Sequence, residues 1–140
     1  MKETIKHSAL KSRTEELIAK IQGIETRIGE EISGGPAAAE TNRLVAASLC
    51  KIAAPILENL QQTVEFITVE TTETNEERLS IDPEVIDATV SMFGVAAESV
   101  LPFALESAAI TLPIAENLIA TAIEKLDEAD KLTEENPKSE

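Results

Sequence analysis

The chain has 140 residues, which is enough for one domain with its own hydrophobic core. It carries 26 acidic and 12 basic residues, and this net charge of −14 disfavours the phosphates of nucleic acids and anionic membrane surfaces. Three Phe and no Trp or Tyr leave few of the aromatic platforms on which single-stranded nucleic acids stack. We therefore expect no nucleic-acid partner.

The start of the chain indicates the compartment. Met1-Lys2-Glu3-Thr4 is polar, and no apolar segment of a secretory signal follows it. Cys50 is the only cysteine, so no disulfide can form within the chain, and its apolar helical surroundings predict a buried thiol that behaves as a small hydrophobic group. We expect a cytoplasmic protein, although leaderless export or assembly into a virion would give the same pattern.

The first predicted helix covers about 3–32. Its apolar residues alternate at spacings of three and four, with Thr14 in the same stripe, and charged residues occupy the other faces. This pattern is typical of a coiled-coil-like arm or the outer helix of a bundle. The stripe consists of Leu10, Thr14, Leu17, Ile21, Ile24 and Ile28.

Ser33-Gly34-Gly35-Pro36 ends that helix, and a second is predicted over 36–69 with a kink at Pro55. Its predicted core face is Val45, Leu49, Ile52, Ile56 and Leu60, extended by Val64 and Ile67. Residues 70–80 have no periodicity and predict a polar, mobile loop. The β-branched stretch 64–72 leaves open a strand instead, which is the weak point of an all-helical assignment.

Two further helices are predicted over 83–99 and 101–131. Asp82 and Pro83 are suited to the N-cap and first position of the third helix, and Pro102 is expected to separate it from the fourth. The fourth has a stripe at three–four spacing and further apolar residues outside it, such as Ile110 and Ile114, so we expect it to be the central helix. The stripe consists of Leu101, Leu105, Ala108, Leu112, Ala115, Ile119, Ala122 and Leu126.

These elements predict an all-α fold, a Pro-kinked four-helix bundle with a coiled-coil-like N-terminal helix. One domain over 1–132 and a disordered acidic tail over 133–140 are expected. Residues 100–123 are long enough to span a bilayer, but Glu106 and Glu116 would each cost about 2.5–3.5 kcal/mol near its centre. A buried or partner-covered helix is therefore the preferred interpretation of this segment.

No catalytic or cofactor pattern is recognisable. His7 is the only histidine and is expected to be exposed near the terminus, and His/Cys zinc sites are excluded by count. The glycine patterns of nucleotide-binding loops are missing, and Asp127, Glu128 and Asp130 are not part of a calcium-binding loop. We predict no enzyme activity, no cofactor and no metal.

Seven residues occur twice in the same order and spacing. Ile52-x-x-Pro55-Ile56-x-Glu58-Asn59-Leu60-x-x-Thr63 returns 58 residues later as Ile110-x-x-Pro113-Ile114-x-Glu116-Asn117-Leu118-x-x-Thr121. The asparagines continue an isoleucine face, as a polar residue that fixes helix register does. A polar pocket for a cation, an amine or a partner's backbone, and chance similarity, remain open. The candidate residues are Pro55, Glu58, Asn59, Pro113, Glu116 and Asn117, and the two helices are expected to pack as neighbours.

Two functions follow from these features. The first is a non-enzymatic helical interaction or assembly protein, a scaffold, adaptor or self-associating component, whose partner is another protein or a second copy of itself. The alternative is an amphipathic helical protein that covers a hydrophobic surface or a lipid.

Overall fold

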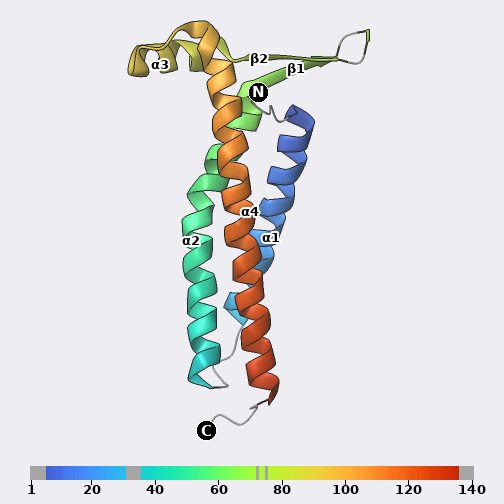
Figure 1. Ribbon diagram of the computed structural model, residues 1–140, viewed down its shortest axis with the longest axis vertical. Coiled ribbons are helices and arrows are strands. Elements are labelled where there is room, and N and C mark those ends of the chain that lie inside the picture. Colours follow the sequence, from blue (N-terminus) through green and yellow to red (C-terminus); the bar gives the residue numbers. More distant parts are fainter. Residues whose placement is uncertain (1–5, 31–35, 72, 75, 136–140) are drawn as a thin grey trace.

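The structure is a computed structural model, which describes residues 6–30, 36–71, 73–74 and 76–135. The described chain is mostly helical, with four helices that pack together and a small sheet. Three long helices lie side by side along the longest axis of the molecule (Figure 1): α1 (His7–Glu30), α2 (Ala37–Phe66) and α4 (Ala97–Glu135).

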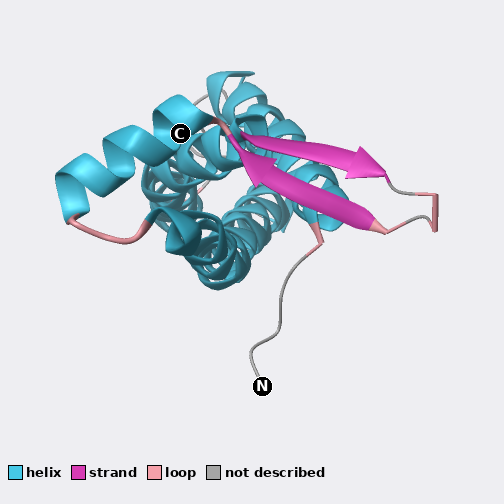
Figure 2. Cartoon of the chain, turned by 90° about the horizontal axis from the view of Figure 1, so that it is seen from above, coloured by secondary structure: helices cyan, strands magenta, loops and turns pink. Residues whose placement is uncertain are grey.

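The remaining elements lie at one end of the long helices (Figure 1). They are β1 (Ile67–Thr71), β2 (Glu77–Ile81) and α3 (Pro83–Phe93). Seen from above, α3 projects to one side and the two strands to the other (Figure 2). The helix α3 thus lies across the end, so α1, α2 and α4 run lengthwise and α3 does not.

The stripes predicted for the first and fourth helices are confirmed. From Leu10 to Ile24 every stripe residue of α1 is buried, and Ile28 is half-buried. In α4 the stripe is buried from Leu105 to Leu126, while Leu101 is half-buried. The two stripes form one core cluster with α2. Within this cluster, the contact between α2 and α4 is the most extensive one between two helices, which confirms that these helices are neighbours.

The predicted core face of α2 is correct in part. Leu60 and Ile67 are buried, and Leu49, Ile56 and Val64 pack partly buried against the core, but Val45 and Ile52 are 37% and 55% exposed. The buried residues of the helix are Ala39, Ala46, Cys50, Ala53, Leu57 and Leu60. Both stripes have three–four spacing, and each residue turns the helix by about 100°, so periodicity does not distinguish them. Packing between α1 and α4 selects the stripe of smaller residues, which lets the helices approach closely.

The predicted loop over 70–80 is largely a hairpin. Strands β1 and β2 pair antiparallel from Ile67 opposite Ile81 to Thr71 opposite Glu77. The strand alternative for 64–72 is therefore correct over Ile67–Thr71, residue 72 lies outside the described residues, and α2 ends at Phe66. Four of the five residues of β1 are β-branched, which favours an extended backbone over a further helical turn.

The boundary between the last two helices lies earlier than predicted. Asp82 caps α3 as expected, because its carboxylate accepts a hydrogen bond from the Glu84 amide at 2.9 Å. The helix ends at Gly94, whose φ of 67° is the left-handed conformation that favours glycine. Pro102 is inside α4 and does not interrupt it, since a proline removes only one backbone donor.

The end of α4 also differs from the prediction. The helix continues to Glu135, and the Thr133 hydroxyl donates a hydrogen bond to the Ala129 carbonyl at 2.8 Å. Residues 133–135 are therefore helical and not part of a disordered tail. The rest of the predicted tail, 136–140, lies outside the described residues, as do 1–5 and 31–35 at the ends of the predicted first helix.

Candidate interaction surfaces

The repeated element lies mainly on the molecular surface. Its two prolines and two asparagines, Pro55, Pro113, Asn59 and Asn117, are exposed, and so is Glu58. Glu116 is half-buried and pairs with Arg13 of α1, so the two glutamates differ in environment. Of the six candidate residues, Asn59 alone lines one of the described cavities, a gap of about 70 Å³ between α2 and α4. Its lining from the first copy of the repeat is Ile56, Asn59, Leu60 and Thr63, and Ser107 and Thr111 of α4 add two hydroxyls.

The repeat instead contributes to an exposed aliphatic surface between α2 and α4, which we call the isoleucine strip. Ile52, Ile110 and Ile114 are 55%, 66% and 47% exposed, while Ile56 is partly buried against the core. Helical spacing places further apolar and small polar residues on the same side of each helix. The strip comprises Val45, Leu49, Ile52 and Ile56 of α2 with Ile110, Ile114 and Leu118 of α4, rimmed by Ser48, Asn59, Thr63, Ser107, Thr111 and Thr121.

The two helices place both copies of the repeat at the same height. They run in opposite directions (Figure 1), and the small cavity joins 56–63 of α2 to 107–111 of α4. With a rise of about 1.5 Å per residue, this alignment sets Ile52 beside Ile114 and Ile56 beside Ile110 to within about one turn. Pro55 and Pro113 then lie near the centre. The two copies of the repeat within the strip are therefore related by an approximate twofold axis perpendicular to the helices.

The strip carries no charged side chain, although the chain has a net charge of −14. Helical spacing directs the nearby charged groups to other sides of the helices: Lys51 and Glu58 on α2, and Glu116, which faces α1. An uncharged surface of this kind sets no carboxylate of this acidic chain against whatever covers it.

A second apolar surface lies at the end of the molecule between α3 and α4. None of the eleven residues of α3, all of which are described, is buried, although its sequence is rich in Val, Ile, Met and Phe. A half-open cavity of about 490 Å³ separates α3 from the first turns of α4. Its lining is mainly apolar and comprises Thr89, Phe93, Val95, Ser99, Val100, Pro102, Phe103 and Glu106. We call it the end cavity.

All three phenylalanines of the chain lie on the surface. Phe93 and Phe103 are 69% and 66% exposed at the end cavity, and Phe66 is 38% exposed at the end of α2. Met92, next to Phe93, is 75% exposed. Sequence reasoning noted the shortage of aromatic residues but not this placement. The sequence feature that could have indicated this exposure is the position of Phe93 and Phe103 on either side of a helix boundary. Few neighbouring side chains can cover a ring there.

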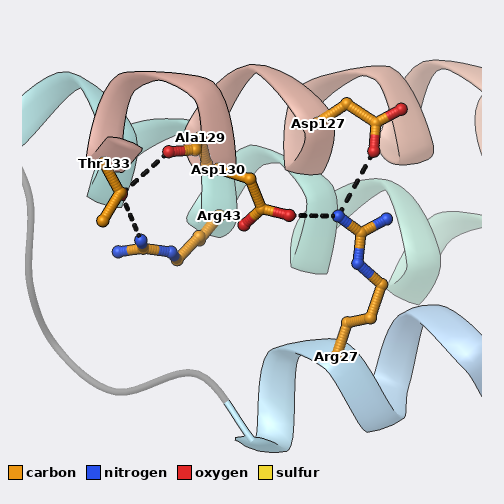
Figure 3. A network of polar contacts seen from close by, with 6 residues as sticks. All are labelled: Arg27, Arg43, Asp127, Ala129, Asp130 and Thr133. Carbon is orange, nitrogen blue, oxygen red and sulfur yellow. Dashed lines mark hydrogen bonds and ion pairs between the residues drawn. The ribbon is translucent and has the colours of Figure 1, made fainter. Parts of the chain in front are cut away.

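Polar contacts join α1 and α2 to the C-terminal part of α4. The Arg27 guanidinium contacts Asp130 at 2.7 Å and Asp127 at 3.3 Å, and Arg43 of α2 donates a hydrogen bond to the Thr133 hydroxyl at 2.9 Å (Figure 3). The acidic cluster near 127–130 thus has a structural partner. Exposed pairs of this kind stabilise by about 0.2–1 kcal/mol each, so the cluster supports the packing of α1 against α4.

His7 and Cys50 are both buried. The prediction of an exposed His7 is wrong: its ring is 9% exposed, and Nε2 lies 3.2 Å from the Val64 carbonyl at the end of α2. Cys50 is 6% exposed, and burial, with a smaller contribution from the charge of Glu25, raises the pKa of its thiol. A protonated, buried thiol is a poor nucleophile, in line with the packing role expected for it.

The described residues contain no group of three or more His, Cys, Asp or Glu that could hold a metal ion. Within them, one helical segment, Ala97–Glu134, has the length and apolar composition of a membrane span, a property that core helices of soluble proteins share. Comparison with protein families, with curated proteins and with solved structures found no match to this chain.

Proposed function

We propose that this protein is a non-enzymatic assembly component that binds a second copy of itself through the isoleucine strip. The observation that carries the proposal is an uncharged aliphatic surface, with two copies of the repeat related by an approximate twofold axis, on an acidic chain. A surface that repeats itself about a twofold axis suits an isologous contact, in which the same patch serves both partners.

The burial of the strip supplies the driving force. Fully burying an isoleucine stabilises by about 1.5–3 kcal/mol, so covering the exposed half of each of Ile52, Ile110 and Ile114 contributes about 1 kcal/mol apiece. Two copies double this sum. It competes with an association cost of roughly 4–15 kcal/mol, so we expect a reversible dimer whose population depends on protein concentration.

In this dimer the α2–α4 pairs of two copies form an intermolecular four-helix bundle, which differs from the bundle within one chain that the sequence predicts. Pro55 and Pro113 lie near its centre, where each proline leaves one backbone carbonyl without its helical donor and favours a bend. Asn59 lies at the rim of the contact and fixes its register through its amide. Within each copy α1 serves as the coiled-coil-like outer helix. We place this assembly in the cytoplasm, with no nucleic acid, cofactor or membrane as partner.

Sedimentation equilibrium of the full chain tests the proposal. The wild type should reach twice its monomer mass with rising concentration, and high salt should not dissociate it, because the contact is uncharged. The double variant Ile52→Ser with Ile110→Ser should stay monomeric. The matched control is Leu44→Ser with Met92→Ser, which removes two side chains that are 69% and 75% exposed outside the strip. Equal loss of mass in both variants would contradict the assignment of the strip.

A second candidate function is the covering of a hydrophobic or lipid surface. The exposed side chains of Met92, Phe93 and Phe103 at one end of the molecule favour it. Addition of neutral phosphatidylcholine vesicles distinguishes the two. A wild-type protein that is monomeric at every concentration, and whose helicity and mass change only with vesicles, would replace self-association by this function.

A further inference from the structure

The end cavity has the size and lining of a ligand site. Its volume of about 490 Å³ falls in the range of small-molecule sites, which are mostly apolar with a few polar groups. Val100, which is 3% exposed, is its most buried lining residue, and Phe93 and Phe103 leave most of their rings open to solvent. Such apolar surface, concave and uncovered, favours an apolar occupant.

The surroundings of the cavity select the charge of that occupant. Glu106 is its one charged lining residue, and Asp87 and Glu98 lie close in sequence to other lining residues. Between Arg78 and Lys125 the sequence contains no Lys or Arg. The cavity therefore lies in a segment whose charged groups are all carboxylates, and their summed field attracts a cation and repels an anion.

The two exposed phenylalanine rings also favour a cationic ligand. The face of a phenylalanine attracts a cation within about 6 Å, and aromatic rings are how proteins recognise quaternary ammonium groups. Phe93 comes from α3 and Phe103 from α4, so the rings belong to the two elements that form the cavity. Aromatic rings with a carboxylate beside an apolar cavity form a site for a cation that carries an apolar chain.

We propose that the end cavity binds a small amphiphilic cation, with its apolar chain between α3 and α4 and its positive group at Glu106 and the phenylalanine rings. This site goes beyond the proposed self-association and does not depend on it. The geometry assigns the anchor of the chain to Val95, Val100 and Pro102.

Titration of the full-length wild type with three dodecyl probes tests this inference. Each probe is used below its critical micelle concentration. The probes are dodecyltrimethylammonium, dodecyl maltoside and dodecyl sulfate, and the readouts are isothermal calorimetry and amide chemical shifts. We expect saturable binding of one dodecyltrimethylammonium per chain, with shifts concentrated over 89–106. Its affinity should exceed that of the neutral probe about tenfold, a gap that salt reduces.

Matched variants separate the two parts of the site. Glu106→Gln should remove most of the preference for the cation and keep binding of the neutral probe, while Glu58→Gln, which removes an exposed carboxylate on α2, should change neither. Phe93→Ala and Phe103→Ala remove rings that are mainly exposed, so these variants should keep the fold. Each should lower the affinity for both the cationic and the neutral probe. Ile52→Ser with Ile110→Ser should bind as the wild type does, so that loss of self-association leaves this site intact.

Three results would overturn the proposal: equal or tighter binding of dodecyl sulfate, shifts spread over all helices, or equal effects of Glu106→Gln and Glu58→Gln. The last would show general attraction of a cation to an acidic protein. The first two results are measured on the wild type, so they hold even if a variant fails to fold.

Discussion

Arg13 of α1 donates two hydrogen bonds to the carboxylate of Glu116 on α4, from Nε to Oε2 at 3.0 Å and from Nη2 to Oε1. These hydrogen bonds raise the pKa of the Arg13 guanidinium, against a smaller opposing effect of burial. Glu116 belongs to the second copy of the repeat. Its equivalent, Glu58, is exposed, so identical residues at matching positions have taken different roles because α1 covers only one of them.

Replacement of Glu116 should therefore cost stability where replacement of Glu58 does not. We expect Glu116→Gln to lower the free energy of unfolding by about 0.5–1 kcal/mol, since a two-point arginine pair that is partly exposed has this strength. Glu58→Gln should change it by less than about 0.5 kcal/mol. Urea denaturation followed by circular dichroism measures both, and equal losses would contradict the asymmetry of the repeat.

The close contact of α2 with α4 depends on small residues. Ala53 and Ala115 are both 0% exposed, so a larger side chain at either position must push the helices apart. We expect Ala53→Leu and Ala115→Leu each to destabilise the protein by about 1–3 kcal/mol. Ala54→Leu, at the exposed neighbouring position of α2, should stay within about 0.5 kcal/mol of the wild type. Thermal unfolding that ranks Ala54→Leu with the other two would refute the observed orientation of α2.

Thr14 is a polar interruption in the core stripe of α1. It is 2% exposed, and its hydroxyl has no hydrogen-bond partner among the described residues. A buried hydroxyl without a partner costs about 1–3 kcal/mol, so Thr14→Val, of nearly the same shape, should raise the free energy of unfolding by about 1 kcal/mol. The control is Thr26→Val. In the wild type the exposed Thr26 hydroxyl donates a hydrogen bond to the Gln22 carbonyl. A Thr14→Val protein less stable than the wild type would reveal a partner for this hydroxyl.

The burial of Cys50 predicts how stability depends on pH. Because the pKa of the thiol is raised in the folded state, the unfolded chain loses this proton first, above about pH 8.5. The contribution of Cys50 is therefore complete below that pH and is lost as the pH rises through the folded pKa.

Urea denaturation at pH 7, 8.5 and 10 measures this contribution, with Cys50→Ala as the reference. The stability of the wild type should fall more steeply toward pH 10 than that of the variant. The folded thiol should also react with a disulfide reagent at pH 8 more than about tenfold slower than the unfolded chain does. Parallel pH curves for the two proteins, with equally fast labelling of both states, would show that the thiol is accessible.

Much of the helical structure was determined by local sequence. The stripes of α1 and α4 and the Asp82 cap were predicted because each depends on spacing or on a hydrogen bond within a few residues. The packing of α2 beside α4 was predicted from the repeat that the two helices share. The candidate site was predicted less well. The repeat was recognised, but its expected buried seam is the exposed isoleucine strip, and the end cavity had no signal in any single element.

The sequence by itself determined that α2 is a helix with two apolar stripes, and only the tertiary structure decided which of them lies inside. Val45 and Ile52 satisfy the same spacing as Ala46 and Ala53, so the difference is a rotation of the helix by one residue. The choice depends on contacts with α1 and α4, which are distant in sequence. Close approach of α4 favours the alanines, and this leaves the isoleucines on the surface, where a partner can cover them.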